Sequence, residues 1–194
     1  MKKYVIIAGV NGTGKSTLYQ SMDFLQSMER VNTDEIVKQF GKWNNPSDVI
    51  KAGKIALNKI QDNFSKGISF NQETTLCGKR IIKNINKAKE LGYIIELHYV
   101  GVDSTEILKK RIAYRVEHGG HGIPDSDVER RYIDSFKQLI QVMDICDVVF
   151  FYDNNRVFRQ FAIYKNNSFY YLSNDFPYWF KLKVLNEKEL FGNE

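Results

Sequence analysis

The chain has 194 residues, of which 43% are hydrophobic and 26% charged, the composition of one ordinary globular domain. No apolar run reaches the roughly 18 residues of a membrane-spanning helix, and only two cysteines occur, Cys77 and Cys146, so we expect a cytoplasmic protein with no membrane partner. The net charge of +5 suits an anionic ligand such as a nucleotide.

Residues 9–16, Gly-Val-Asn-Gly-Thr-Gly-Lys-Ser, lie between an apolar strand pattern over residues 3–8 and a helical pattern that begins near Lys15. Strand, glycine-rich loop and helix in this order predict a P-loop, whose amide groups face a phosphate. We therefore predict ATP and Mg²⁺ as cofactors, with Lys15 at the β- and γ-phosphates and the Ser16 hydroxyl as the metal ligand. The predicted ATP-binding residues are Gly9, Asn11, Gly12, Thr13, Gly14, Lys15, Ser16 and Thr17.

The P-loop helix should pack on the sheet through Leu18, Met22 and Leu25, which recur at helical spacing. A second short strand over residues 30–34 then ends at Asp34. Ligands of open α/β sheets bind at the carboxyl ends of strands, so Asp34 is a candidate general base. A helix N-cap is an equally weighted alternative for this aspartate.

A loop over residues 40–46 precedes a helix that Ser47 or Asp48 can cap and that ends at Lys66-Gly67. A short strand over residues 68–70 then leads to Glu73-Thr74-Thr75. These three polar side chains beside the phosphate site can hydrogen-bond a sugar or another polyol. The alternative for Glu73 is a carboxylate that caps the helix beginning near Gly78.

A helix closed by Gly92 and a strand over residues 93–100 come next. Asp103 and Glu106 have the spacing of a capping box at the start of the following helix. On that helix Arg111 and Arg115 share a face, and they either point at phosphates or lie solvated on the surface.

Residues 118–124, the lid loop, contain three glycines and a proline, which predicts a mobile connection. Ser126 and Glu129 can cap the next helix, whose first turns carry Arg130 and Arg131. Two arginine-bearing helices joined by a glycine hinge are what a phosphoryl-transfer lid needs. We interpret His121 as a lid-loop histidine near phosphate and not as a zinc ligand.

A buried strand over residues 147–152 ends in Asp153-Asn154-Asn155, where the aspartate is either a Walker B carboxylate or part of a turn. A β-hairpin and an aromatic tail complete the chain. We predict one domain over residues 1–194, with a core over 1–155 and the hairpin and tail over 156–194. The predicted fold is α/β: a three-layer P-loop NTPase with a mostly parallel five-stranded sheet flanked by helices and a C-terminal hairpin extension.

The motifs together resemble the zeta-toxin family over roughly residues 4–155, and more closely its stand-alone bacterial members, often described as predicted ATPases. They are the P-loop, Asn32-Thr33-Asp34, Glu73-Thr74-Thr75, Arg115-Val116 leading into Gly119-Gly120-His121, Arg130-Arg131-Tyr132 and Tyr152-Asp153-Asn154. Zeta toxins are P-loop kinases that use ATP and Mg²⁺ to phosphorylate the amino sugar of UDP-N-acetylglucosamine. The resemblance implies Asp34 as general base, Glu73 with Thr74 or Thr75 as sugar ligands, and Arg115 with Arg130 or Arg131 at the phosphates.

The predicted function is therefore transfer of the ATP γ-phosphate to a small-molecule hydroxyl, above all that of a sugar nucleotide. An inhibitory antitoxin protein is a candidate partner, and nucleic acid is not expected. The sequence lacks the guanine-binding motif of GTPases and the signature of ABC transporter ATPases. Two alternatives stay open: a polynucleotide end kinase, whose affinity would fall steeply with salt, and a nucleotide-binding regulator without catalysis.

Overall fold

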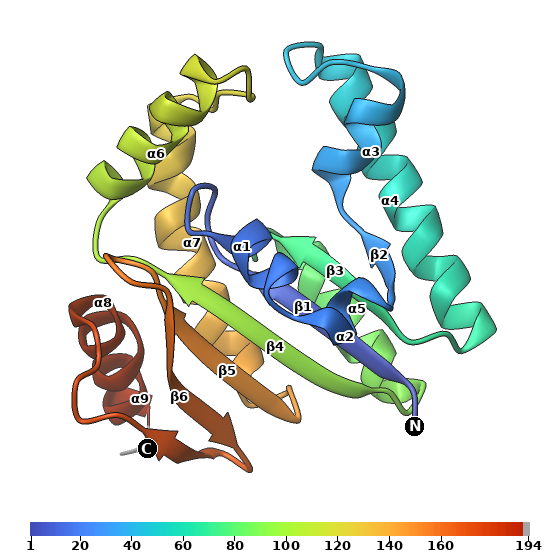
Figure 1. The fold of residues 1–194 in the computed structure, drawn as a ribbon. Helices are drawn as coiled ribbons and strands as arrows, with labels where there is room; N and C mark the ends of the chain where they lie inside the picture. Colours follow the sequence, from blue (N-terminus) through green and yellow to red (C-terminus); the bar gives the residue numbers. More distant parts are fainter. Residues whose placement is uncertain (192–194) are drawn as a thin grey trace.

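The computed structural model describes residues 1–191 (Figure 1), so residues 192–194 of the predicted tail lie outside the described residues. Its strands are β1 (Lys3–Ala8), β2 (Glu29–Val31), β3 (Phe70–Thr74), β4 (Ile94–Gly101), β5 (Val148–Asp153), β6 (Arg159–Lys165) and β7 (Ser168–Leu172). Its helices are α1 (Lys15–Gln20), α2 (Asp23–Gln26), α3 (Thr33–Phe40), α4 (Pro46–Lys66), α5 (Lys79–Glu90), α6 (Thr105–Glu117), α7 (Asp125–Met143), α8 (Tyr178–Phe180), the π-helical turn η1 (Lys181–Leu185) and α9 (Asn186–Phe191).

The strands form one sheet in the order β2-β3-β1-β4-β5-β6-β7. The first five strands in sequence pair in parallel, whereas β6 and β7 add to β5 as an antiparallel hairpin. The predicted parallel sheet of five strands with a hairpin extension is confirmed. The hairpin extends the same sheet and does not form a separate layer.

Different helices cover the two faces of the sheet. Successive side chains of a strand point to opposite faces, so alternate residues of β1 pack against different helices. On β1, Tyr4, Ile6 and Ala8 belong to the large core cluster, which also contains buried residues of α3, α4, α5, α7 and the C-terminal tail. Val5 and Ile7 point to the other face and pack with residues of α1 and α2. The sheet is therefore the middle of three layers.

The strand register brings the candidate site residues to one edge of the sheet. Ile7 of β1 lies opposite Glu73 of β3, and Val31 of β2 lies opposite Gln72. The P-loop after β1, the start of α3 after β2 and the end of β3 are consequently neighbours. This is the carboxyl edge, where ligands bind in open α/β folds.

The helix after the P-loop differs from the prediction. Leu18 and Leu25 are buried and Met22 packs beside them, as expected, but Met22 has an extended backbone (φ −126°, ψ 101°). The expected helix is therefore split into α1 and α2. Met22 bends the chain so that both short helices lie against the same face of the sheet.

Several expected helix caps and one strand boundary are also wrong. The side chain of Asn45 caps α4, two residues before Ser47 and three before Asp48. Strand β3 spans Phe70–Thr74, whereas residues 68–70 were expected. Neither α6 nor α7 has a capping side-chain hydrogen bond. The Asp103 carboxylate is used elsewhere, because it accepts a hydrogen bond from the backbone N–H of Trp179 at 2.8 Å.

The aromatic tail folds back onto the domain, as its composition predicts. Trp179 and Phe180 are buried in the large core cluster. In Figure 1, α8 lies beside the carboxyl end of β4, which is the end of the sheet that carries the P-loop. The tail is therefore close to the candidate site.

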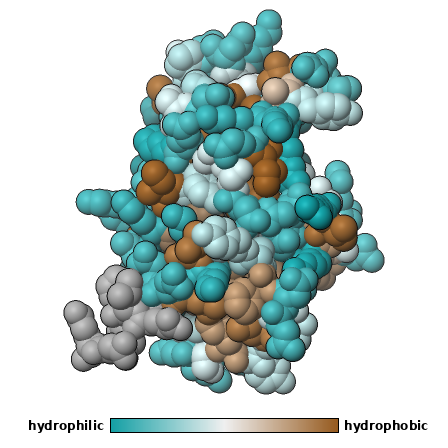
Figure 2. Space-filling model, turned by 90° about the vertical axis from the view of Figure 1, so that its left-hand side faces the viewer, coloured by the Kyte–Doolittle hydropathy of each residue, from teal (hydrophilic) through white to brown (hydrophobic). Residues whose placement is uncertain are grey.

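Most of the surface seen in Figure 2 is hydrophilic, and the apolar residues on this face gather mainly in its lower half. Across the described residues, every helix is too short or too polar to cross a membrane.

Candidate active site

The P-loop has the backbone shape of a phosphate cradle. Gly9, Gly12 and Gly14 have φ angles of 139°, 87° and 105°, a region that side chains disfavour. A Cβ on Gly9 would lie 2.3 Å from the carbonyl oxygen of Val100, so only glycine fits there. The Thr13 hydroxyl donates to the Val10 carbonyl at 2.9 Å. It therefore braces the loop.

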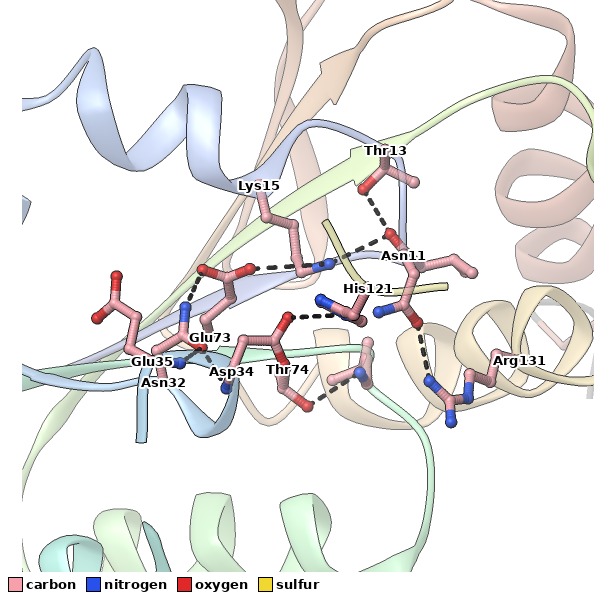
Figure 3. Close-up of polar contacts among 12 residues, drawn as sticks. Asn11, Thr13, Lys15, Asn32, Asp34, Glu35, Glu73, Thr74, His121 and Arg131 are labelled. Atoms are coloured by element: carbon pink, nitrogen blue, oxygen red, sulfur yellow. Dashed lines mark hydrogen bonds and ion pairs between the residues drawn. The ribbon is translucent and has the colours of Figure 1, made fainter. Parts of the chain in front are cut away.

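Lys15 is buried beside a carboxylate. Its ammonium donates to the Val10 carbonyl at 3.2 Å and lies 4.0 Å from Oε1 of Glu73 (Figure 3). Burial lowers the pKa of Lys15, and the negative charges of Glu73 and Asp34 oppose this shift. A buried ammonium whose paired carboxylate is 4.0 Å away is suited to a phosphate dianion.

Glu73 lies on β3 and is held by two donors from the β2 segment. Its Oε2 accepts from Arg30 Nη2 at 2.9 Å and from Asn32 Nδ2 at 2.7 Å. The alternative of a helix cap is wrong, because these bonds fix Glu73 inside the cleft. Its other oxygen, Oε1, faces Lys15.

Asp34 occupies the first turn of α3. The cap of this helix is Asn32, whose side chain accepts from the backbone N–H groups of Asp34 and Glu35. The N-cap alternative for Asp34 is therefore wrong. The Asp34 carboxylate does not cap the helix and faces the cleft. Its Oδ2 lies 3.5 Å from Nε2 of His121 (Figure 3).

Three cavities meet in the cleft. The P-loop cavity, of about 180 Å³, is lined by Asn11, Gly12, Gly14, Lys15, Ser16, Asp34, Glu73 and Arg115. The β3 cavity, of about 390 Å³, contains Glu73, Thr74 and Thr75 in its wall, and the α3 cavity, of about 730 Å³, contains Ser16, Lys38 and Arg115. Among the described residues, Asp34 alone lines all three cavities.

The two threonines contribute differently to the β3 cavity. The Thr74 hydroxyl already accepts the backbone N–H of Leu76 at 3.0 Å. Both Thr74 and Thr75 line the cavity wall. Thr17, by contrast, is exposed on α1 and lines none of these three cavities.

The lid loop, which follows α6, lines part of the cleft. Arg115 lines the P-loop cavity, and its Nη2 donates to the His121 carbonyl at 2.8 Å. The His121 ring stacks on Trp43, with centroids 4.5 Å apart and planes at 16°. Burial lowers the pKa of His121, as does the nearby Arg115, whereas Asp34 opposes the shift. The neutral imidazole is therefore favoured in this contact.

Arg130 and Arg131 point in different directions. Arg131 lines the β3 cavity and donates from Nη1 to Oδ1 of Asn11 in the P-loop at 2.9 Å (Figure 3). The side chain of Arg130 is 56% exposed and pairs with Asp127 and Asp134 on its own helix. The structure thus brings Arg131 to the P-loop and leaves Arg130 outside.

The alternatives for Arg111 and Asp153 are also decided by their contacts. Arg111 binds backbone carbonyls, including Gly12 O at 3.3 Å and Asn154 O at 2.7 Å. It lines none of the three cavities described above. Oδ1 of Asp153 accepts from Asn155 and from the Trp179 indole. These contacts favour the turn over a Walker B role.

Two residues of the site carried no usable signal in the sequence. Arg30 stacks over the Tyr19 ring at 3.5 Å while it binds Glu73 and Glu35, which links α1, β2 and β3. Trp43 is a lone aromatic residue in a loop. Both act through partners distant in sequence, which no local pattern records.

The residues fit the predicted cofactors. The glycine cradle with Lys15 suits a nucleotide polyphosphate, and the Ser16 hydroxyl at the P-loop cavity suits Mg²⁺. Within the described residues there is no cluster of three or more His, Cys, Asp or Glu side chains for a metal. Mg²⁺ in kinase sites takes one or two protein ligands, with phosphates and waters, so a cluster is not required.

Comparisons with known proteins agree with this fold. The chain is 36% identical over 131 residues to an uncharacterized protein of Haemophilus influenzae, which covers 67% of this chain and 92% of that protein. The structure of AvrRxo1-ORF1:-ORF2 with ATP matches 88% of this chain with a TM-score of 0.70 and 15% identity, and this chain spans only 60% of that one.

A structure from the PezAT chromosomal toxin-antitoxin system of Streptococcus pneumoniae matches 100% of this chain and 87% of that chain, with a TM-score of 0.59 and 15% identity. Likeness at such identities concerns the fold, and it confirms the P-loop kinase-type fold that the resemblance to zeta toxins implies. The sequence profile of the AAA domain family, AAA_33, matches residues 5–143, so the chain belongs to this family.

Proposed function

We propose that the protein is an ATP-dependent phosphotransferase of the zeta-toxin type, which moves the γ-phosphate of ATP to a hydroxyl of a small molecule. The observation that carries this proposal is the position of Asp34, which lines both the P-loop cavity and the β3 cavity. A carboxylate between a phosphate site and a second cavity is suited to be a kinase's general base.

The cationic residues of the site are assigned to the phosphates, and the carboxylate of Asp34 is assigned to the acceptor hydroxyl. Lys15 and the loop amides would hold the β- and γ-phosphates. Ser16 would hold Mg²⁺, which would supply charge neutralisation for the phosphate oxygens. Asp34 accepts the proton of the acceptor hydroxyl as that oxygen attacks the γ-phosphorus, and the bond to the β–γ bridging oxygen breaks to leave ADP. Arg115 and Arg131 offset the charge that spreads over the transferred group.

We assign the acceptor to the sugar nucleotides, with UDP-N-acetylglucosamine as the first compound to test. The assignment rests on the resemblance of Asp34, Glu73, Thr74 and Thr75 to the zeta-toxin motifs. The β3 cavity supports it, because hydroxyl, amide and carboxylate groups there can bind a polyol. Oε1 of Glu73 lies 4.0 Å from the ammonium of Lys15 and can accept a sugar hydroxyl.

An inhibitory protein is the proposed partner. Of two structures with this fold, one is AvrRxo1-ORF1:-ORF2 and the other comes from the PezAT toxin-antitoxin system. If this chain has such a partner, expressing it alone should slow growth and the Asp34→Asn variant should not. Equal growth with both proteins would argue against toxicity.

The direct test is transfer from γ-labelled ATP. The protein is incubated with Mg²⁺ and, in separate reactions, with UDP-N-acetylglucosamine, an oligonucleotide with a free 5′-hydroxyl, and a metabolite extract. We expect label on the sugar nucleotide and none with the folded Lys15→Ala variant. Label on the oligonucleotide would indicate an end kinase, and ATP binding without transfer to any acceptor would indicate a regulator.

A further inference from the structure

Asn154, which lies outside the residues matched by the AAA_33 profile, contacts the P-loop directly. The AAA_33 profile ends at residue 143, whereas Asn154 follows β5. Its Nδ2 donates to the carbonyl oxygen of Thr13 at 2.8 Å. A Cβ on Gly14 would lie 2.4 Å from that same nitrogen, so the glycine is what allows Asn154 to come so close.

This contact meets a need that every phosphate cradle creates. When the amide groups of a loop turn toward an anion, the carbonyl groups turn away and require donors of their own. The Gly12 carbonyl receives Arg111 Nη1 at 3.3 Å, and the Thr13 carbonyl receives Asn154. Arg111 Nη2 also binds the Asn154 carbonyl at 2.7 Å, so one arginine joins the P-loop to the turn that carries Asn154.

The C-terminal tail holds this turn from the other side. The Trp179 indole N–H donates to Oδ1 of Asp153 at 3.3 Å, and the same oxygen accepts Asn155 Nδ2 at 2.8 Å. Trp179 is 1% exposed. A Cβ on Gly101 would lie 2.5 Å from the Trp179 ring, so the absence of a side chain at this glycine leaves room for the indole.

We infer that Asn154 is a positioning residue for the P-loop, and that the tail fixes Asn154 through Trp179 and Asp153. Asn154 acts through the Thr13 carbonyl, so that the loop amides are already arranged before a phosphate arrives. Such preorganisation reduces the ordering cost of binding. This role of Asn154 depends on the proposed function in one respect only, namely that the P-loop binds ATP.

The first test replaces Asn154 by alanine and measures hydrogen exchange of residues 9–16 without nucleotide. We expect faster exchange in this segment and a rise of about threefold to tenfold in the Kd for ATP, the size of one lost hydrogen bond. Asn154→Asp keeps the shape without the donor, and it should behave no better than alanine. Asn58→Ala, at an exposed position of α4, is the matched control and should change neither quantity.

The second test replaces Trp179 by phenylalanine, which retains an aromatic ring but removes the indole donor. Exchange of residues 9–16 should again quicken, and the double variant should be no worse than Asn154→Ala, because both changes act along one path. A lower melting temperature with wild-type exchange at residues 9–16 and wild-type ATP affinity would overturn the inference. If the wild type bound no ATP, the proposed function would fail, while the exchange measurement would still decide the role of Asn154.

Discussion

Nε2 of His121 lies 3.5 Å from Oδ2 of Asp34, so the lid loop touches the candidate general base. The other side of the imidazole is covered by Trp43. A hydroxyl that binds this oxygen of Asp34 competes with the histidine for it. The contact therefore links acceptor binding to the lid loop.

Asp34→Asn should reduce turnover by about 100-fold or more, because a general base contributes roughly 10² to 10⁴ to the rate. ATP affinity should change little, since the carboxamide keeps the size of the side chain. Labelled transfer and equilibrium ATP binding measure the two effects. Asp62→Asn, at an exposed position of α4, controls for the loss of one negative charge. A drop in melting temperature alone would show that Asp34 is only structural.

Arg131→Ala and Arg130→Ala form a matched pair of neighbours on α7. Only Arg131 reaches the P-loop, through Asn11, so its loss should lower kcat by at least tenfold. Arg130 pairs with carboxylates on its own exposed helix face, and its loss should leave kcat within about twofold. Steady-state kinetics of both variants decide the matter. Equal losses would remove the distinction made between them.

Gly120→Ala should impair transfer more than Gly119→Ala. A Cβ on Gly120 would lie 2.5 Å from Cγ of Arg115 and 2.9 Å from its carbonyl oxygen, so alanine must displace the arginine. A Cβ on Gly119 meets nothing within 4 Å, and alanine at its φ of 81° costs about 1–2 kcal/mol of backbone strain. We expect a lower kcat for Gly120→Ala alone. Hydrogen exchange over residues 115–131, with and without ATP and Mg²⁺, reports whether the lid still closes.

Stability should fall in acid because of His98, which is buried on β4. Burial lowers the pKa of His98 from 6.5 to about 4, and the charge of Lys3 adds to the shift. Between these two values the unfolded chain binds the proton and the folded protein does not, so the free energy of unfolding decreases as pH falls from 6.5 to about 4. At about 1.4 kcal/mol for each pKa unit, the loss approaches about 3 kcal/mol.

Urea unfolding of the wild type and of His98→Phe across this pH range measures the contribution. The phenylalanine keeps the stack on Phe150 but cannot bind a proton, so its stability should vary less with pH than that of the wild type. His118→Gln, at the exposed end of α6, should retain the full dependence. Identical pH profiles for wild type and His98→Phe would contradict the assignment.

The sequence predicted the parts of the fold that depend on local pattern. The P-loop, the parallel sheet and the hairpin follow from glycine spacing, apolar runs and turn residues. Helix caps failed where a better candidate stood nearby, as Asn45 does before Ser47. Asp103 was expected to cap α6, but its carboxylate accepts a hydrogen bond from the distant Trp179. No local sequence pattern reveals such a contact.

The site could be predicted in its residue types but not in its contacts. Neighbours such as Arg130 and Arg131 point about 100° apart on a helix, so the rotation of α7 decides which one faces the P-loop. The position of Trp43 against His121 depends on two loops distant in sequence. Only the assembled structure shows that Arg30 and Asn32 restrain Glu73, which the pattern presented as a free sugar ligand.

The hairpin of β6 and β7 determines at which edge of the sheet the C-terminal tail begins. β5 runs toward the P-loop edge, β6 returns to the opposite edge, and β7 runs toward the P-loop again. An even number of added strands therefore delivers the chain back to the edge from which it left, where Trp179 meets Asp153. One added strand would have carried the tail to the far edge. Because the extension has an even number of strands, the segment around Trp179 lies at the P-loop edge of the sheet.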